Sequence, residues 1–355
     1  MELFNTLQDV RACTVILELR SKDAFDSSHI DSSVHASPGD PQRAASHIAE
    51  KCSSRCKWEV VLVTQRSPSD VELHAFLRKS KLLSLEHVEK VQVLAEGFND
   101  FHQCFPFLCS DSPSFKESRL YPSMITPEFS VFLSSHALAY DIEVLRTLAI
   151  THVINVTHDH PNAIGAEDEL GIRYIRVPVV DESTQDLQSH LSRSVLFLDE
   201  AVRSGGRVLV HCRHGQSRSA SVLLAWFMLT RNWSLEQTLA YLQQQRPRVS
   251  PNHGFQKQVR QWVEERNAAT ITDPENPLLP PPASLTTSSG VCGESWTGDT
   301  RTFNSEAMHR IEKRAKHLAA SFPDAPLAFV MLPGVSHWFY THPALPPSRL
   351  SACVS

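Results

Sequence analysis

The sequence has no excess of positive charge, and this argues against one large class of proteins. Its 355 residues include 34 Lys and Arg against 39 Asp and Glu, which gives a formal net charge of −5. A protein that grips nucleic acid nonspecifically needs a broadly basic surface. No nucleic-acid partner is therefore expected, and any attraction for an anion must be local.

Long hydrophobic runs, internal repeats and export signals are also missing. The run VLLAWFML ends after eight residues, well short of a membrane span. The N-terminus lacks a basic region followed by a continuous apolar core, so no secretory leader is expected, and Glu2 excludes N-myristoylation. Eight cysteines without an export signal are typical of reduced thiols. We therefore expect a cytoplasmic protein, a nuclear protein, or one found in both compartments.

The composition that is present, 41% hydrophobic and 21% charged, suits two compact domains. Residues 1–112 contain the strand-like runs TVILEL, EVVLVT and VQVL between helical patterns. Residues 119–268 show the same alternation, with the runs THVINVT, RYIRVPVV and RVLVH. Both parts are predicted to be α/β domains, the first with a parallel sheet and the second with a central sheet flanked by helices.

The last part of the chain changes composition. Residues 269–304 are rich in Pro, Ser, Thr and Gly, which predicts a flexible linker. In the tail, residues 305–355, apolar positions recur at steps of three and four and predict an amphipathic helix over 305–322 with a basic opposite face. Those apolar positions are Met308, Ile311, Ala315, Leu318 and Phe322. This helix either packs on the second domain or acts as a docking peptide.

The stretch HCRHGQSRS, residues 211–219, carries the strongest chemical signal. It follows the apolar run VLV and precedes a helical pattern, so its backbone N–H groups and a helix N-terminus should converge on one point that favours an anion. The same donors would stabilise the thiolate of Cys212 and make it a nucleophile at neutral pH. The planar guanidinium of Arg218 could hold two oxygens of a phosphate, and Ser219 is placed to hydrogen-bond the sulfur.

Phosphoryl transfer to a cysteine also needs an acid for the leaving oxygen. The segment VPVVDESTQD offers Asp181, which we expect where a strand ends. Each feature also has a plain structural explanation. A buried cysteine is often a small hydrophobe, a loop with Gly is often only a turn, and an Asp after a strand is commonly a cap. The combination within one strand–loop–helix unit favours chemistry.

HCRHGQSRS matches the signature H-C-x-x-x-x-x-R-S of protein tyrosine phosphatases, and residues 119–267 resemble the dual-specificity branch of that family. The segments YIRVPVVDESTQDL and QQQRPRVSPNHGFQKQV are similar to its acid loop and closing helices. The resemblance implies that Cys212 is the nucleophile, that Arg218 binds phosphate, and that Asp181 is first the acid and then the base. It also implies that Ser219 aids departure of the thiolate. The loop residues that would surround the phosphate are Arg213, His214, Gly215, Gln216 and Ser217.

The N-terminal part resembles a rhodanese domain in the stretch TVILELRSKDAFDSSHI. In active sulfurtransferases, the strand matching EVVLVT ends in a cysteine. Here Thr64 and Gln65 follow Val63, so no persulfide chemistry is expected. Such a noncatalytic domain before a phosphatase domain resembles a MAP kinase phosphatase.

One part of the MAP kinase phosphatase pattern is missing. That family carries consecutive arginines for kinase docking between the His-Ile pair and the next strand. The corresponding interval of this chain has only the scattered basic residues Arg43, Lys51, Arg55 and Lys57. A phosphorylated protein is the expected partner and a MAP kinase is a candidate, but only weak docking through this interval is predicted.

No cofactor or metal is expected. Cys52, Cys56, Cys104 and Cys109 could form a four-thiolate zinc site, but neither spacing is C-x-x-C, and scattered core thiols fit better. The sequence segment 158–160, His-Asp-His, could supply ligands, although a solvated loop fits better.

Three functions remain open at this point. The first is a dual-specificity protein phosphatase. The second is the same chemistry on a nonprotein phosphate, such as a phosphoinositide or an RNA 5′ end, which Arg213 and His214 inside the loop keep in consideration. The third is a noncatalytic phosphoprotein-binding module, which would be expected if the nucleophile were missing. The presence of Cys212, Arg218 and Asp181 argues against it.

Overall fold

The computed structural model divides into two compact units, and each is described by itself. It describes residues 1–272 except for 10–11, 38, 41, 43–45, 47, 49–56, 66–75, 81, 83–84, 86–87, 96, 111–118, 127–129 and 164, and beyond them residues 290–291, 301–302 and 327–329. Unit 1 contains Met1–Thr6, Val10–Arg119 and Ser288–Ser355. Unit 2 contains Leu7–Asp9 and Leu120–Thr287. Among these described residues, no helix is both long and apolar enough to cross a membrane.

Unit 1 is built on a parallel sheet with the strand order β14-β5-β4-β1-β3. Its strands are β1 (Thr14–Glu18), β3 (Val34–His35), β4 (Trp58–Val63), β5 (Val88–Val93) and β14 (Leu327–Phe329). The short pairs β2 (His29–Ile30) with β6 (Cys109–Ser110), and β12 (Gly290–Val291) with β13 (Arg301–Thr302), are antiparallel. The helices are α1 (Glu2–Gln8), whose first residues belong here, α2 (Lys22–Ser27), α5 (Gly97–Cys104) and the 3₁₀ turn η2 (Pro106–Leu108).

A buried ion pair lies at the end of β1. The Arg20 guanidinium donates to Glu18 Oε2 and lies 3.5 Å from the centroid of the Phe98 ring. The other oxygen of Glu18 accepts hydrogen bonds from the backbone N–H of Ile30 (2.6 Å) and from Ser33 Oγ (2.8 Å). Every oxygen of this buried carboxylate is thus satisfied, which is the condition for keeping such a charge in a core. In this unit Arg20, which follows the first strand, therefore has a structural role: it neutralises and hydrogen-bonds the buried Glu18.

Unit 2 is built on a sheet with the strand order β10-β9-β11-β8-β7, parallel except for the antiparallel β7–β8 pair. Its strands are β7 (Ser123–Met124), β8 (Val131–Ser135), β9 (His152–Asn155), β10 (Arg173–Arg176) and β11 (Val208–Cys212). Its short helices are α6 (His136–Ala139), α7 (Ile142–Thr147) and α8 (Ala166–Leu170). Its longer helices are α9 (Gln188–Arg203), α10 (Arg218–Arg231), α11 (Leu235–Gln245) and α12 (His253–Thr272).

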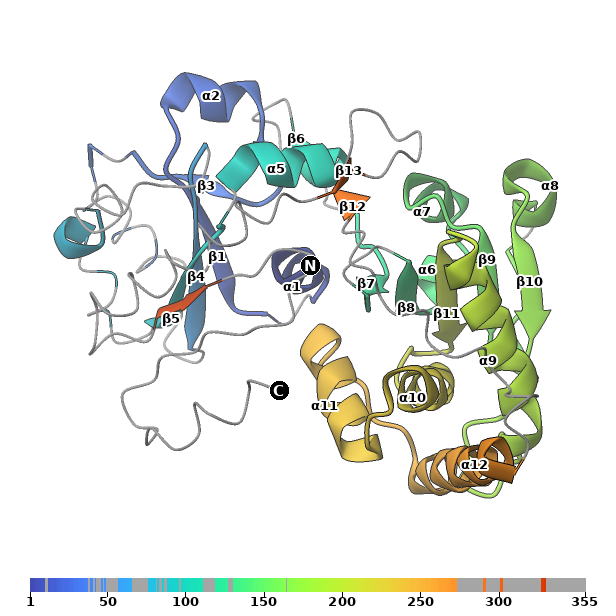
Figure 1. The fold of residues 1–355 in the computed structure, drawn as a ribbon. Coiled ribbons are helices and arrows are strands. Elements are labelled where there is room, and N and C mark those ends of the chain that lie inside the picture. Colours follow the sequence, from blue (N-terminus) through green and yellow to red (C-terminus); the bar gives the residue numbers. More distant parts are fainter. Residues whose placement is uncertain are drawn as a thin grey trace, which may run out of the picture. The chain divides into compact units, whose positions relative to one another are not determined.

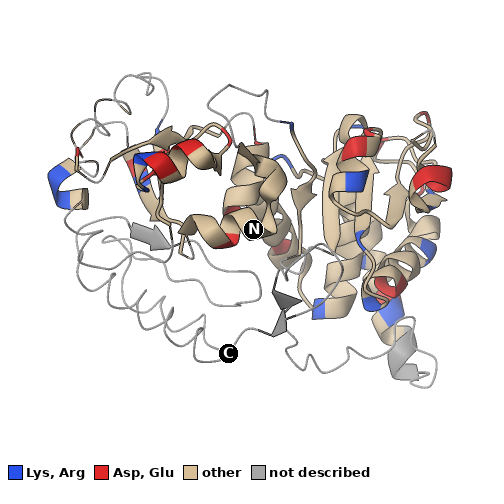
Figure 2. Cartoon of the chain, turned by 90° about the horizontal axis from the view of Figure 1, so that it is seen from above, with Lys and Arg blue, Asp and Glu red and all other residues tan. Residues whose placement is uncertain are grey.

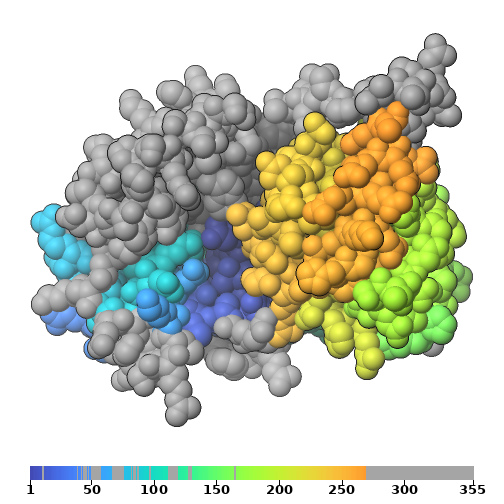
Figure 3. All heavy atoms as spheres, turned by 90° about the horizontal axis from the view of Figure 1, so that it is seen from below, coloured from blue at the N-terminus to red at the C-terminus, as the bar shows by residue number. Residues whose placement is uncertain are grey.

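Helix α10 is the centre of this unit. It contacts β11 on one side and α9, α11 and α12 on the others (Figure 1). Its residues from Arg218 to Met228 are all buried, which suits the apolar run ASVLLAWFM. Helices α11 and α12 form one outer side of the unit (Figure 3). The nucleophile loop between β11 and α10 is therefore held between a central strand and a central helix.

Local sequence signals explain where several helices begin and end. Ser234 and Gln237 form a reciprocal capping box at the start of α11. Asp141 caps α7 by accepting from two backbone N–H groups. Asn232 ends α10 in the left-handed conformation, with φ of 52°.

Most of the expected strands are found, and the predicted α/β fold class is confirmed for both units. The runs TVILEL, EVVLVT and VQVL correspond to β1, β4 and β5, and RVLVH corresponds to β11. Helix α12 continues to Thr272, past the predicted start of the linker at 269. The predicted tail helix 305–322 and most of the linker lie outside the described residues.

Charge is distributed without a dominant sign. Lys and Arg are interspersed with Asp and Glu over the described parts of both units (Figure 2). This agrees with the expectation that any anion site is local.

Candidate active site

The loop 213–217 connects the buried end of β11 to the first turn of α10. Cys212 ends β11 and is 1% exposed, and Arg218 begins α10 and is 5% exposed. Gly215 lies in this loop at φ of 66°, and a Cβ there would lie 2.4 Å from the carbonyl oxygen of Ser134. Only glycine fits this turn, because both the conformation and the close backbone approach exclude a side chain.

The sulfur of Cys212 is surrounded by hydrogen-bond donors. The backbone N–H of Gly215 donates to Sγ at 3.2 Å, and Ser219 Oγ donates at 3.1 Å. Burial alone would raise the pKa of the Cys212 thiol. Hydrogen bonds from Ser219 and from the loop backbone, together with the Arg218 charge, nevertheless hold that pKa below its ordinary value. The site thus favours a thiolate.

The Arg218 guanidinium lies at the C-terminal end of the same loop and has one N–H group that makes no hydrogen bond within the described part of the chain. One terminal nitrogen donates to the carbonyl oxygen of Val179 at 3.1 Å, which fixes the guanidinium. Its Nε is buried and has no hydrogen-bond partner among the described residues. At 3.6 Å from Asp181 Oδ2 this Nε forms only a long ion pair, so its hydrogen-bond position is open to an oxyanion of a ligand.

Asp181 lies next to Arg218, but the expectation that it ends a strand was wrong. Strand β10 ends at Arg176, and Asp181 follows in a loop. The backbone N–H of Val177 still donates to Asn155 O at 2.8 Å, but the next donor on that side, the N–H of Val179, turns back to the carbonyl of Val177 at 2.8 Å and ends the pairing. The loop then carries Asp181 toward the nucleophile, and its Oδ2 lies 3.6 Å from Nε of Arg218.

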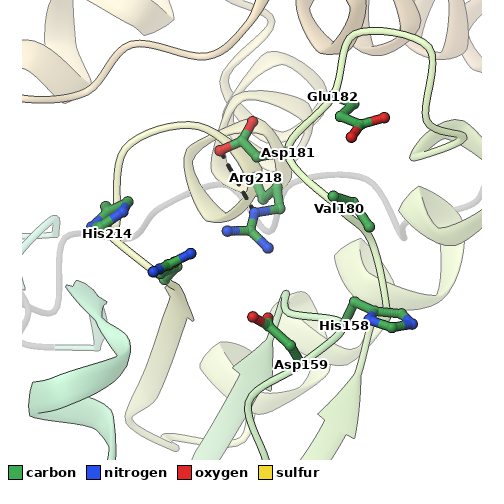
Figure 4. Close-up of a pocket in the computed structure, with 8 residues that line it drawn as sticks. His158, Asp159, Val180, Asp181, Glu182, His214 and Arg218 are labelled. Atoms are coloured by element: carbon green, nitrogen blue, oxygen red, sulfur yellow. Dashed lines mark ion pairs between the residues drawn. The ribbon is translucent and has the colours of Figure 1, made fainter.

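Arg218 and Asp181 line a cavity of about 320 Å³. Its lining has cationic Arg218 and Arg213 with His214, and the carboxylates of Asp159, Asp181 and Glu182, together with His158 and Val180. Figure 4 shows the Arg218 guanidinium between Asp181 and Asp159. Val180 is 39% exposed beside Asp181, so the rim also has an apolar contact. The cavity therefore combines an anion site with an acidic and partly apolar surround.

The structure brings the sequence-predicted site residues together in different ways. Cys212, Gly215 and Ser219 meet at the sulfur, while Arg213, His214 and Arg218 line the cavity. The hydroxyl of Ser217 instead donates to Asp181 Oδ1 at 2.6 Å. The carbonyl of Gln216 accepts from the backbone N–H of Ser250 at 2.9 Å.

Two residues at the site were not singled out from the sequence. Arg246 donates to the carbonyl oxygens of Gly215 (2.9 Å) and His214 (3.1 Å), so it supports the loop from behind. Asn252 donates to Asp181 Oδ1 at 3.0 Å. Both stand in QQQRPRVSPNHGF, and no local chemical pattern in that stretch connects Arg246 to Gly215, 31 positions away, or Asn252 to Asp181, 71 positions away.

Three histidines lie close together behind the loop. The rings of His136 and His160 stack with centroids 4.0 Å apart, and His136 lies 6.2 Å from His211. Burial lowers the pKa of His211 to about 3, so this imidazole is neutral at physiological pH.

Residues 158–160 are divided between the cavity and a pair of stacked histidines. Asp159 and His158 line the cavity, whereas His160 stacks on His136. Cys109 donates to the carbonyl of Phe105, and the segment with Cys52 and Cys56 lies outside the described residues. Within the part of the chain that is described, no group of three or more His, Cys, Asp or Glu has a metal-binding arrangement.

Family models match both units of the chain. A model of the dual specificity phosphatase catalytic domain matches residues 131–265, and a model of the rhodanese-like domain matches residues 3–104. Human dual specificity phosphatase 28 is 34% identical over 158 residues, which cover 44% of this chain and 88% of that protein. The chain belongs to the dual specificity phosphatase family.

Other members of the family share parts of this architecture. Human dual specificity protein phosphatase 2 is 33% identical over 213 residues, covering 55% of this chain and 65% of that protein. A probable rhodanese domain-containing dual specificity protein phosphatase of Dictyostelium discoideum is 24% identical over 331 residues, covering 74% of this chain and 68% of that protein. The crystal structure of human DUSP28 has 33% sequence identity, covers 41% of this chain and 97% of that one, and gives a TM-score of 0.37.

The expected order of a rhodanese-like domain followed by a dual specificity phosphatase domain is confirmed. The chain spans under two thirds of the length of dual specificity protein phosphatases 2 and 16, at 65% and 36%. The domain boundaries 1–112, 119–268, 269–304 and 305–355 stay predictions.

Proposed function

We propose that this member of the family is an active, cysteine-dependent protein phosphatase that hydrolyses phosphotyrosine and phosphoserine or phosphothreonine. One observation carries the proposal. Cys212, whose thiol has a lowered pKa, begins the loop whose Arg213, His214 and Arg218 line a cavity together with the carboxyl group of Asp181. A noncatalytic binding module would have no need of such a thiol.

The chemistry has two steps. The thiolate of Cys212 attacks phosphorus while Arg218 binds two nonbridging oxygens, so an S–P bond forms as the P–O bond to the substrate breaks. Asp181 gives its proton to the leaving oxygen. Water then attacks the phosphocysteine, Asp181 takes a proton from that water, and the thiolate leaves with the hydrogen bond from Ser219 in place.

The lining of the cavity supports a protein phosphoester over a polyanionic substrate. Asp159 and Glu182 stand beside the phosphate site and would repel the additional phosphates of a phosphoinositide or an RNA triphosphate. Val180 offers an apolar contact to the ring of phosphotyrosine or the chain of phosphothreonine. Arg213 and His214 favour an acidic group, or a second phosphate on the same peptide, on their own side.

We also propose phosphorylated MAP kinases as substrates, in the cytoplasm or nucleus, because of the two-domain order. Of the four scattered basic residues in the docking interval, Lys57 is described and exposed, and Arg43, Lys51 and Arg55 lie outside the described residues.

The test compares four substrates with the full-length protein: a phosphotyrosine peptide, a phosphothreonine peptide, a soluble phosphoinositide and an RNA with a 5′ triphosphate. We expect the two peptides to give the highest kcat/KM, and Cys212→Ser to abolish turnover of all substrates while the protein stays folded. Asp159→Asn should raise kcat/KM for the two polyanions relative to the peptides. Turnover retained by Cys212→Ser would refute the mechanism, and a preference for a polyanion would refute the substrate class.

A further inference from the structure

The carboxylate of Asp181 is held asymmetrically. Its Oδ1 accepts two hydrogen bonds, from Ser217 Oγ at 2.6 Å and from Asn252 Nδ2 at 3.0 Å. Its Oδ2 faces Nε of Arg218 at 3.6 Å, which is too long for a hydrogen bond. One oxygen is therefore occupied by protein donors and the other is left at the cavity.

The orientation of the Asn252 amide follows from its other contacts. Its side-chain oxygen accepts from the backbone N–H of Phe255 at 2.9 Å, which makes Asn252 the N-cap of α12. With the oxygen committed to the helix, the NH₂ group must face Asp181. The backbone N–H of Asn252 also donates to Ser217 Oγ at 3.2 Å, so the Ser217 hydroxyl proton is directed to Asp181.

The rest of the acid loop is fastened to the same helix. A Cβ on Gly254 would lie 1.9 Å from the carbonyl oxygen of Ser183, so the loop backbone rests directly on the first turn of α12. One turn later, Gln258 Oε1 accepts from the backbone N–H groups of Leu187 (2.8 Å) and Gln188 (3.0 Å). The start of α12 and its N-cap thus hold the acid loop at Asp181, at Ser183 and at its C-terminal end.

We propose that Asn252, together with Ser217, is a positioning residue that occupies Oδ1 of Asp181 and so assigns Oδ2 to proton transfer. This rests on the proposed function of Asp181. A proton on Oδ1 would face two hydrogen-bond donors, whereas Oδ2 has only the long ion pair to Arg218, which a bound phosphate would replace, so the acidic proton resides on Oδ2. During attack, the Oδ2–H bond breaks, the proton goes to the leaving oxygen as the P–O bond breaks, and Asp181 is left as a carboxylate.

The central variant is Asn252→Ser in the full-length protein. Serine is an equally good N-cap, so its hydroxyl can still accept from the Phe255 N–H, but it is too short to reach Asp181. We expect unchanged thermal stability. Misplacement of the acid should lower kcat by about 10- to 100-fold for phenyl phosphate and much less for p-nitrophenyl phosphate, because the latter's leaving group needs little protonation.

Three further variants separate positioning from other causes. Asp181→Ala should show the same dependence on the leaving group with a larger loss, and Asn252→Ser in an Asp181→Ala background should add nothing. Asn99→Ser, in α5 of the other unit, is the matched control and should change neither rate. Gly254→Ala should give the leaving-group signature independently, because its Cβ displaces the loop at Ser183.

The outcomes distinguish positioning by Asn252 from the acid role of Asp181, on which it rests. If Asp181→Ala shows the leaving-group signature and neither Asn252→Ser nor Gly254→Ala does, positioning by Asn252 is overturned and the acid role of Asp181 stands. Equal losses on both substrates for Asp181→Ala would overturn the acid role and the positioning with it. A purely structural role for Asn252 would lower the thermal midpoint and leave the leaving-group dependence unchanged.

Discussion

At the scale of single residues, the reactivity of the site depends on the donors around one sulfur. The pKa of Cys212 is held below its ordinary value against the effect of burial, and the Ser219 hydroxyl is the foremost of the lowering causes. The thiolate therefore persists at pH values below the usual range of a thiol. It should react with electrophiles there, below the pH at which an ordinary thiol ionises.

Ser219→Ala should move this titration upward. Removing the hydroxyl takes away a donor that favours the thiolate, so the pKa of Cys212 rises and the midpoint of alkylation shifts to higher pH. The measurement is the rate of iodoacetamide alkylation of Cys212 against pH, followed by mass spectrometry. Ser221→Ala is the matched control, because that buried hydroxyl donates to the Ser217 carbonyl instead. An unchanged midpoint in Ser219→Ala would show that the hydroxyl does not stabilise the thiolate.

Oxidation should follow the same thiolate. A thiolate with a lowered pKa reacts with peroxide, so mild oxidation should inactivate the protein and a thiol reductant should restore it. Vanadate occupies the place of phosphate next to Arg218 and should protect Cys212. The measurement is residual activity after peroxide, with and without vanadate. Inactivation at the same rate in both samples would assign the effect to a different cysteine.

The residues that could be predicted from the sequence are those whose chemistry lies in one short stretch. Cys212, Arg218 and Ser219 stand within a single strand–loop–helix segment, so local geometry alone brings them together. Asp181 could be assigned as the acid only through the resemblance to the family, which places an acid loop at this distance before the cysteine. Asn252 is separated from Asp181 by 71 positions and reaches it only through tertiary packing. No periodicity or local motif carries that information.

At the scale of secondary-structure elements, the buried parallel strands were predictable and their ends were not. The strand runs are continuous and apolar because both faces of a parallel sheet are covered. The end of β10 depends instead on the turn over residues 177–179, where the Val179 N–H donates to the Val177 carbonyl, and the support of the nucleophile loop depends on a residue that comes after α11. That residue is Arg246, which holds two loop carbonyls.

Arg246→Ala should loosen the loop between β11 and α10. Two carbonyl oxygens lose a charged donor, and we expect a loss of about 1–3 kcal/mol in the free energy of unfolding. Vanadate should also bind more weakly, because the loop amides are no longer held in place. Denaturant unfolding and vanadate inhibition measure the two effects. Arg248→Ala is the matched control at an exposed position of the same segment, and equal effects of the two variants would contradict the support role.

At the scale of the whole molecule, the open question is how a phosphatase domain finds its substrate. The rhodanese-like domain lacks the cysteine of a sulfurtransferase, since Thr64 and Gln65 follow β4. A domain that keeps its sheet without a nucleophile is most simply a binding platform. Its docking interval has four scattered basic residues instead of consecutive arginines.

We expect this interval to contribute little to MAP kinase binding. Exposed ion pairs contribute about 0–1 kcal/mol each, so four scattered charges do not replace a concentrated patch. The test titrates a MAP kinase with full-length protein in which Arg43, Lys51, Arg55 and Lys57 are changed to Gln. A matched variant changes the tail residues Lys313, Arg314 and Lys316 to Gln. Tight, salt-sensitive binding that only the first variant loses would restore the docking mode of the family.

The position of Cys212 on β11 has a consequence for how the protein loses activity. That strand pairs with β8 on one side and β9 on the other, so its amide hydrogens exchange with solvent only when the sheet opens. The segment with Asp181 belongs to no sheet and is held by the side chains of Asn252 and Ser217. Mild heat or denaturant should therefore displace the loop with Asp181 under conditions in which β11 and Cys212 stay in place. A partly destabilised molecule would still form the phosphocysteine from a substrate with a good leaving group, and would first lose the substrates that depend on a proton.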